Sequence, residues 1–145
     1  MDYKDCMEFA NANRTAHVAT VEGNQPRVRP MGLWFADEHG FYFQIQTVKA
    51  VYKQLMANPK VELCFFTPAA GGRVMRVTGE VEFVHDRAVK QRVLNERKFL
   101  QGMGIDRPDH PLLAVFRVAK GEAFFWTMAD SMKEAAIPRI KFDLQ

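Results

Sequence analysis

Hydrophobic and polar residues alternate along much of the chain with the period of two that is typical of β-strands. The clearest case is residues 73–84, where Met75, Val77, Val81 and Phe83 share one face and mostly polar or charged residues occupy the other. Further strand-like runs cover residues 16–21, 27–35, 41–46, 61–67 and 112–126. Helical spacing is confined to residues 4–13, 48–57 and 87–100. The pattern predicts six strands and three short helices.

Turn-forming residues join neighbouring strands closely. Residues 23–26 and 37–40 are rich in Gly, Asn, Asp and Pro and leave no room for the crossover that parallel strands need. We therefore expect antiparallel pairing in a mainly β protein, organised as a six-stranded split β-barrel. At 145 residues, with no linker or repeat, the chain is predicted to form a single domain spanning residues 1–145.

Three local features refine this picture. The nearly continuous apolar run 61–67 predicts a strand buried on both faces, with Cys64 as a small buried residue. The last strand is expected to bulge at residues 120–121. The tail that follows Thr127 contains Pro138 and is expected to pack on a partner subunit.

Composition and charge narrow the class of protein. The net charge is only +3, and basic residues are interleaved with acidic ones, so we do not expect a nucleic-acid partner. The longest apolar run is far too short to cross a bilayer, and the N-terminus has no signal-peptide core. We expect a soluble cytoplasmic protein. The two cysteines predict neither a metal site nor a disulfide framework.

The segment 44–55 carries the most informative charges. Lys49 and Lys53 are four residues apart near the start of the predicted helix 48–57, with Thr47 as its expected cap. Two cations at a helix N-terminus repel each other and oppose the helix dipole, unless an anion binds there. The alternative is that both lysines simply point into water.

A second basic pair lies upstream. Arg27 and Arg29 fall on one side of a strand. Pro30 has no backbone N–H to donate to a neighbouring strand, which indicates an edge strand or a bulge. Gly32 allows close approach of a flat ligand or another backbone. Two guanidinium groups there suit a phosphate or an electron-rich ring, although surface arginines on the wet face of a hairpin are the plainer interpretation.

These segments together resemble a known family. The stretches Q-P-R-V-R-P-M-G, G-F-Y-F-Q-I-Q-T-V-K, K-Q-L-x-x-N-P-K-V-E-L and R-V-M-R-V-T-G-E-V occur in that order between residues 18 and 82. They resemble the pyridoxamine 5'-phosphate oxidase-like FMN-binding split barrels, and in particular the short branch of nitroimidazole-resistance-type proteins.

The resemblance implies a homodimer that holds two FMN molecules in clefts between its subunits. The residues that it implies for cofactor binding lie on two strands, one helix and the end of the last strand: Arg27, Arg29, Pro30, Met31, Gly32, Gln44, Ile45, Gln46, Thr47, Lys49, Lys53 and Trp126. Thr47 and the two lysines would receive the phosphate. Trp126 would reach the flavin of the other subunit, or serve as a core or dimer-packing residue.

The resemblance also bears on activity. It implies an FMN-dependent oxidoreductase that passes electrons or hydride from a reduced donor to a small aromatic or quinone-like acceptor. The chain has Thr47-Val48-Lys49 in place of a serine-arginine-lysine motif, and no histidine follows Arg139 as the vitamin-oxidising enzymes require. We therefore do not expect a typical pyridoxamine phosphate oxidase. A non-catalytic protein that stores or senses FMN, haem or a deazaflavin is the alternative.

Overall fold

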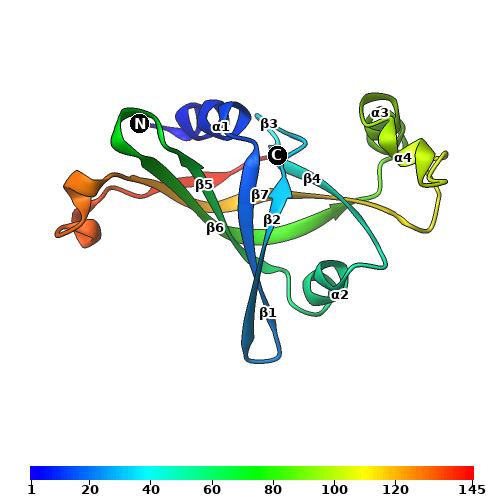
Figure 1. The fold of residues 1–145 in the computed structure, drawn as a ribbon, viewed down its shortest axis with the longest axis horizontal. Coiled ribbons are helices and arrows are strands. Elements are labelled where there is room, and N and C mark those ends of the chain that lie inside the picture. Colours follow the sequence, from blue (N-terminus) through cyan, green and yellow to red (C-terminus); the bar gives the residue numbers. More distant parts are fainter.

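The longest strand, β7 (Leu113–Trp126), organises the sheet in the computed structural model, which describes residues 1–145 (Figure 1). The strand order is β2-β1-β5-β6-β7-β4-β3, with β8 also paired to β7, and every pairing is antiparallel. The other strands are β1 (Thr15–Glu22), β2 (Gln25–Gly32), β3 (Phe35–Asp37), β4 (Gly40–Gln46), β5 (Lys60–Thr67), β6 (Arg73–Val84) and β8 (Ile140–Asp143).

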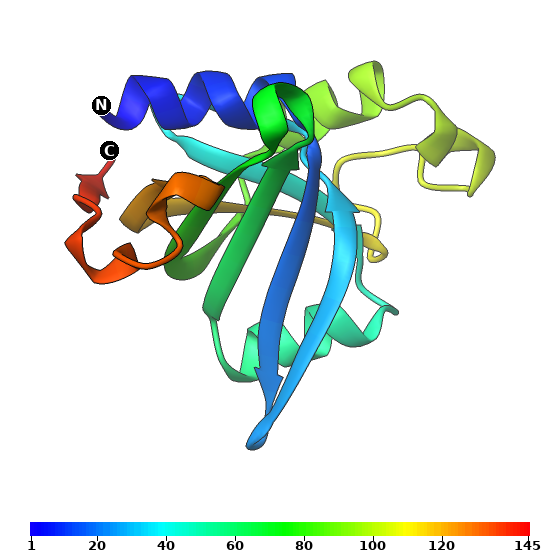
Figure 2. The same cartoon turned by 60° about the vertical axis from the view of Figure 1, so that its left-hand side comes forward.

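Four helices and three single 3₁₀ turns complete the fold. The helices are α1 (Tyr3–Ala12), α2 (Ala50–Ala57), α3 (Arg87–Glu96) and α4 (Phe99–Gly102), and the turns cover Ala69–Gly71, Met128–Asp130 and Glu134–Ala136. In Figure 2, α1 lies across one end of the strands, and the tip of the β1–β2 hairpin projects from the other end, beside α2. Asp86 caps α3, since the Val89 amide donates to Asp86 Oδ1 at 3.1 Å.

Two apolar clusters lie on opposite faces of β4, and this arrangement positions the candidate site. The larger cluster fills the barrel with buried aromatic rings, including stacked Phe43 and Phe116 with centroids 5.2 Å apart. The smaller cluster places Trp34 and Tyr42 beneath α3 and α4. The Trp34 indole donates to Glu96 Oε1 at 3.1 Å, so α3 is tied to the sheet. Alternate residues of β4 therefore belong to different environments.

The mainly β, antiparallel class is confirmed, but the predicted count of six strands is wrong, because the sheet has eight. The run 27–35 is divided into β2 and β3 by Leu33 and Trp34, which pack into different clusters. Within the tail, Ile140–Asp143 forms a strand that pairs with β7 of its own chain, and packing of the tail on a partner subunit stays a prediction. No pairing joins β2 to β3 or β4, so the barrel stays open there.

Two further expectations are corrected by the burial pattern and the helix start. β5 alternates between buried and accessible residues, so it is buried on one face; Phe66 is half exposed and Cys64 is partly accessible. Helix α2 begins at Ala50 with Lys49 at its N-cap position, and no side chain caps it. Thr47 does not cap α2, because its hydroxyl donates to the Pro111 carbonyl oxygen at 2.8 Å instead.

The predicted bulge in β7 is confirmed. The register shifts between Gly79 and Val81 of β6, where Val118 and Gly121 are the partners on β7. A Cβ atom on Gly121 would lie 1.9 Å from the Thr78 carbonyl oxygen, and one on Gly79 would lie 2.6 Å from the Lys120 carbonyl oxygen. Two backbones thus approach at a distance that only glycine permits.

We predict that Gly121→Ala lowers the free energy of unfolding by about 3 kcal/mol or more, because the new methyl group overlaps backbone that cannot move away. Gly102→Ala is the matched control, since a Cβ there meets nothing within 4 Å. Urea unfolding followed by circular dichroism measures both. Equal stabilities of the two variants would contradict the close approach.

Candidate functional site

The open side of the barrel is bordered by β2 and by the second half of β4. β2 is an end strand that pairs only with β1, as Pro30 predicted, and the pairing of β3 with β4 ends at Tyr42. Helix α2 lies near this opening and packs Val51 and Leu55 into the core (Figure 1). Most of the residues expected to bind the cofactor surround this opening.

Arg29 is held at the opening by neutral groups alone. Its Nη1 donates to Thr20 Oγ1 at 2.7 Å and to the Val18 carbonyl oxygen at 3.3 Å, and its Nη2 donates to Gln54 Oε1 at 2.5 Å. The Thr20 hydroxyl also donates to Gln54 Oε1, at 2.5 Å. Burial, and secondly the charge of Arg27, lowers the pKa of Arg29 from its usual value. A guanidinium nevertheless stays protonated in proteins.

Arg27 differs from Arg29 although both lie on one side of β2. Its Nε and Nη2 donate to Glu22 Oε1 at 3.1 and 3.0 Å, in an exposed ion pair. The charge of Arg27 is therefore balanced within the chain, whereas no carboxylate contacts Arg29. Of the two predicted arginines, Arg29 is the better suited to an external anion.

The α2 end of the site carries two further cations. Lys49 and Lys53 are exposed and form no ion pair, and the first turn of α2 contains no acidic residue. Free backbone N–H groups and two lysines thus lie at one helix end, which suits a phosphate. Thr47 lies beside them, with its hydroxyl donating to the loop before β7.

The β4 residues divide between the two faces of the sheet. The Ile45 side chain is buried in the barrel core, so only its backbone lies at the open edge of β4. Gln44 and Gln46 point to the opposite face, and each has a buried polar atom without a partner, namely Gln44 Nε2 and Gln46 Oε1. Gln46 Nε2 contacts the Met103 sulfur at 3.7 Å. Unpaired buried polar atoms are uncommon and mark a place where a ligand can bind.

The remaining β2 residues leave space at the opening. Met31 is half buried against the barrel core, and Pro30 is exposed. A Cβ on Gly32 would meet nothing within 4 Å, so no backbone of this chain makes the close approach that its small size permits. The space beside Gly32 is open to a ligand or to a second chain.

Trp126 lies far from all of these residues within one chain. It ends β7, whereas Leu113 at the start of β7 pairs with Gln46. A strand of this length separates its ends by roughly 40 Å at about 3.3 Å per residue. Trp126 instead borders a hollow of about 390 Å³ with Cys64, Arg76 and Phe124. The strands β6, β5 and β1 separate β7 from β2, which is about 19 Å at roughly 4.8 Å per strand, so Trp126 does not contact Arg29 within one chain.

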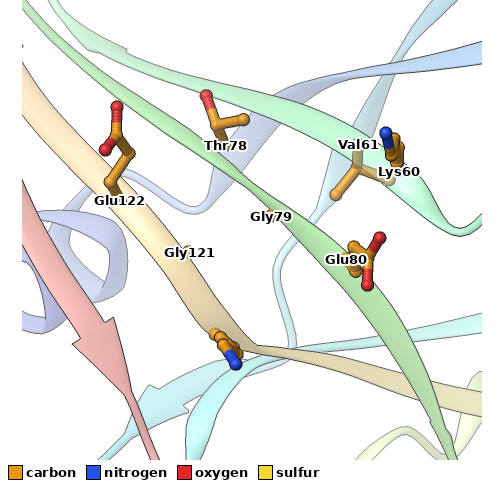
Figure 3. Close-up of a pocket in the computed structure, with 8 residues that line it drawn as sticks. Lys60, Val61, Thr78, Gly79, Glu80, Gly121 and Glu122 are labelled. Atoms are coloured by element: carbon orange, nitrogen blue, oxygen red, sulfur yellow. The ribbon is translucent and has the colours of Figure 1, made fainter.

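Two other hollows contain few or none of the predicted residues. The first has a volume of about 420 Å³ and lies over Gly79 and Gly121, flanked by Lys60, Glu80 and Glu122 (Figure 3). The second, of about 200 Å³, contains Thr47 and is lined by polar groups that include His85, Lys90, Asp109 and His110.

Sequence reasoning missed two residues that the fold places at Arg29. Gln54 is 5% exposed and Thr20 is 2% exposed, and both are polar residues on faces that otherwise pack on the core. That position on an apolar face is the signal that could have found them, since a buried polar side chain needs a partner.

Comparison with known proteins agrees with this fold. The model of the pyridoxamine 5'-phosphate oxidase family matches residues 4–127, and the chain therefore belongs to this family. A NimC/NimA family protein from Clostridium acetobutylicum is 30% identical, with a TM-score of 0.78 over 96% of this chain and 92% of that one. The predicted nitroimidazole-resistance-type branch is thus confirmed. No curated protein matches the sequence.

Two more distant crystal structures share the fold alone. An FAD-binding protein from Mesorhizobium loti has 18% identity and a TM-score of 0.59, over 85% of this chain and 92% of that chain. HutZ, a haem storage protein from Vibrio cholerae, has 18% identity and a TM-score of 0.60, over 81% and 89%. In this chain no helix is both long and apolar enough to cross a membrane.

We predict that Gln44→Leu raises the free energy of unfolding by about 1 kcal/mol, because it removes a buried amide donor that has no partner. Gln91→Leu is the control, since Gln91 is exposed on α3 and its amide reaches Asn95 at 3.0 Å. Thermal unfolding of the ligand-free protein checks both. A loss of stability in Gln44→Leu would contradict the assignment of this amide as unpaired.

Proposed function

We propose that this protein binds FMN at the open side of the barrel, in a homodimer, and transfers electrons from a reduced donor to a small aromatic or quinone-like acceptor. The observation that carries the proposal is Arg29, a partly buried cation that no carboxylate of the chain balances. Membership of the pyridoxamine 5'-phosphate oxidase family supports a flavin as the ligand.

The residues present fit the anionic part of FMN. Arg29, Lys49 and Lys53 supply positive charge, and the uncapped N-terminus of α2 supplies backbone N–H groups. A phosphate there would relieve the repulsion between the lysines and satisfy the helix end. Gln44 Nε2, which lacks a partner, is a donor that could serve the ring of the flavin.

Bound FMN would supply the hydride or electron transfer itself. The chain's own residues have the tasks of binding, orientation and exclusion of water. Arg29 and the α2 end would hold the anion, and the buried face of β4 would orient the ring. A buried amide donor beside the ring, such as Gln44 Nε2, would favour the negative charge of the reduced flavin.

The proposed dimer follows from two observations. Within one chain the strands β6, β5 and β1 separate Trp126 on β7 from Arg29 on β2. Large apolar residues are also exposed on several elements, among them Val28, Val48, Phe66 and Phe99. Pairing two chains about a two-fold axis would cover such residues and bring Trp126 of one chain to the opening of the other.

We predict that the purified protein binds FMN and shows flavin absorption bands, and that Lys49→Ala together with Lys53→Ala weakens binding roughly tenfold. Two cations near a phosphate contribute on the order of 1.4 kcal/mol together. The control is Lys98→Ala with Lys141→Ala, which removes two exposed lysines elsewhere. Quenching of FMN fluorescence gives the dissociation constants.

A protein that stays colourless and ignores FMN would contradict the proposal, and a Soret band would assign the opening to haem. Turnover with a reduced nicotinamide donor and a quinone or nitroaromatic acceptor separates an enzyme from a storage protein. Flavin that binds tightly but is never reduced would favour storage.

We also predict that FMN binding depends on the dimer. Trp126→Ala should weaken FMN binding several-fold although it lies roughly 40 Å along β7 from Gln46. Met132→Ala, at an almost fully exposed residue in the same part of the chain, is the control. Sedimentation velocity and FMN titration at matched protein concentrations check this. A monomer that binds FMN at every concentration, unaffected by Trp126→Ala, would contradict it.

A further inference from the structure

In the hydrogen-bond network around Arg29, the side-chain acceptors are occupied and the unpaired groups are donors. Gln54 Oε1 accepts two hydrogen bonds, from Arg29 Nη2 and from the Thr20 hydroxyl, each at 2.5 Å. Thr20 Oγ1 accepts one more, from Arg29 Nη1. The side-chain acceptors of this network are thus engaged. The groups that remain unpaired are the Arg29 Nε–H, one Arg29 Nη2–H and the Gln54 amide N–H groups, and all of them are donors.

The charges around this network do not balance Arg29. On β1, Glu22 is engaged by Arg27, and no hydrogen bond or ion pair joins it to Arg29. On α2, the charged residues are Lys49, at the N-cap, and Lys53, and both are cationic. A cation that is partly removed from water and surrounded by neutral acceptors and donors attracts an oxyanion.

We propose that Gln54 is a positioning residue that fixes Arg29 for an oxyanion and, because its side chain is neutral, leaves the charge of Arg29 available to that ligand. This rests on the proposed function in naming the FMN phosphate as the oxyanion. The unpaired N–H groups of Arg29 and Gln54 favour an acceptor with several oxygens. Thr20 holds the Gln54 side chain in place, because its hydroxyl donates to Gln54 Oε1 and keeps that oxygen directed toward Arg29.

A glutamate at position 54 has nearly the same shape as the natural glutamine, but its negative charge would balance that of Arg29. Gln54→Glu would place a negative charge 2.5 Å from Arg29 Nη2 and replace the free amide donor with an acceptor. An opposite charge this close keeps the new carboxyl ionised. Arg29 would then be balanced within the chain, and an oxyanion would meet repulsion instead of a donor. The fold should be kept, since a buried pair replaces an unbalanced cation.

The test compares Gln54→Glu with wild type in two measurements. The first is the affinity for FMN. The second is the rise in melting temperature that inorganic phosphate causes, relative to chloride at equal ionic strength. We expect at least a tenfold weaker FMN affinity, no phosphate-specific rise, and a ligand-free melting temperature no lower than that of wild type. Met56→Glu adds the same charge on the exposed face of α2 and should change FMN affinity less than threefold.

Gln54→Met carries the test if Gln54→Glu does not fold. It keeps position 54 neutral but lacks the hydrogen bonds, so phosphate should still stabilise it and FMN should bind with an affinity between those of wild type and Gln54→Glu. The inference is overturned if Gln54→Glu binds FMN within threefold of wild type, if Met56→Glu is equally damaging, or if phosphate has no effect on Gln54→Met.

Failure of the proposed function gives a different result. If wild type ignores FMN but is stabilised by phosphate, and Gln54→Glu abolishes that stabilisation, the role of Gln54 stands and the ligand is another oxyanion. If phosphate does not stabilise wild type more than chloride does, the role of Gln54 fails, whatever FMN does.

Discussion

The fold depends on the close backbone contact between β6 and β7 at Gly79 and Gly121. These strands form the longest ladder of the sheet, and the extra residue at the bulge changes the register between its two halves. On one side of the bulge β7 pairs with β4, and on the other it pairs with β8. A bulge increases the local twist and bends the strand. The sheet can therefore curl into a barrel while β2 and β3 remain its end strands. Each of them pairs with one neighbour only.

The open side of the barrel follows from that curvature and is where charge is left unbalanced. Elsewhere most arginines form an ion pair with a carboxylate or lie over an aromatic ring. Arg76 does so with Glu62 and Phe124, and Arg92 does so with Glu96 and Trp34. Arg29 has only neutral hydrogen-bond acceptors. Arg14 and Arg97 likewise reach only backbone carbonyl oxygens, so the lack of a carboxylate marks Arg29 as a candidate ligand-binding cation only together with its place at the open side of the barrel.

Much of this fold could be predicted from the alternation of hydrophobic residues, and the errors have physical causes. The run 27–35 reads as one strand because Leu33 and Trp34 are both apolar, yet they pack on opposite faces and break the ladder. β5 reads as doubly buried because Phe66 and Cys64 are apolar, but one of its faces stays accessible. Ile140–Asp143 is too short and too polar to be distinguished from a loop without knowing that the edge of β7 is free.

The candidate site was only partly predictable from the sequence. Spacing placed Arg27 and Arg29 on one side of a strand, but only tertiary structure shows that Glu22 balances the first and that Gln54 and Thr20 surround the second. The proposed role of Trp126 depends on a second chain, which no sequence pattern specifies.

A crystal structure of the protein with FMN is the most direct test of the central claim, that Arg29 is left unbalanced for the anion of a flavin. The account predicts that oxygen atoms of the phosphate lie within hydrogen-bonding distance of Arg29 Nε and the Gln54 amide, and that Trp126 of the partner subunit borders the ligand. FMN bound elsewhere, such as over Gly79 and Gly121, with Arg29 unchanged and without contact to it, would contradict the account.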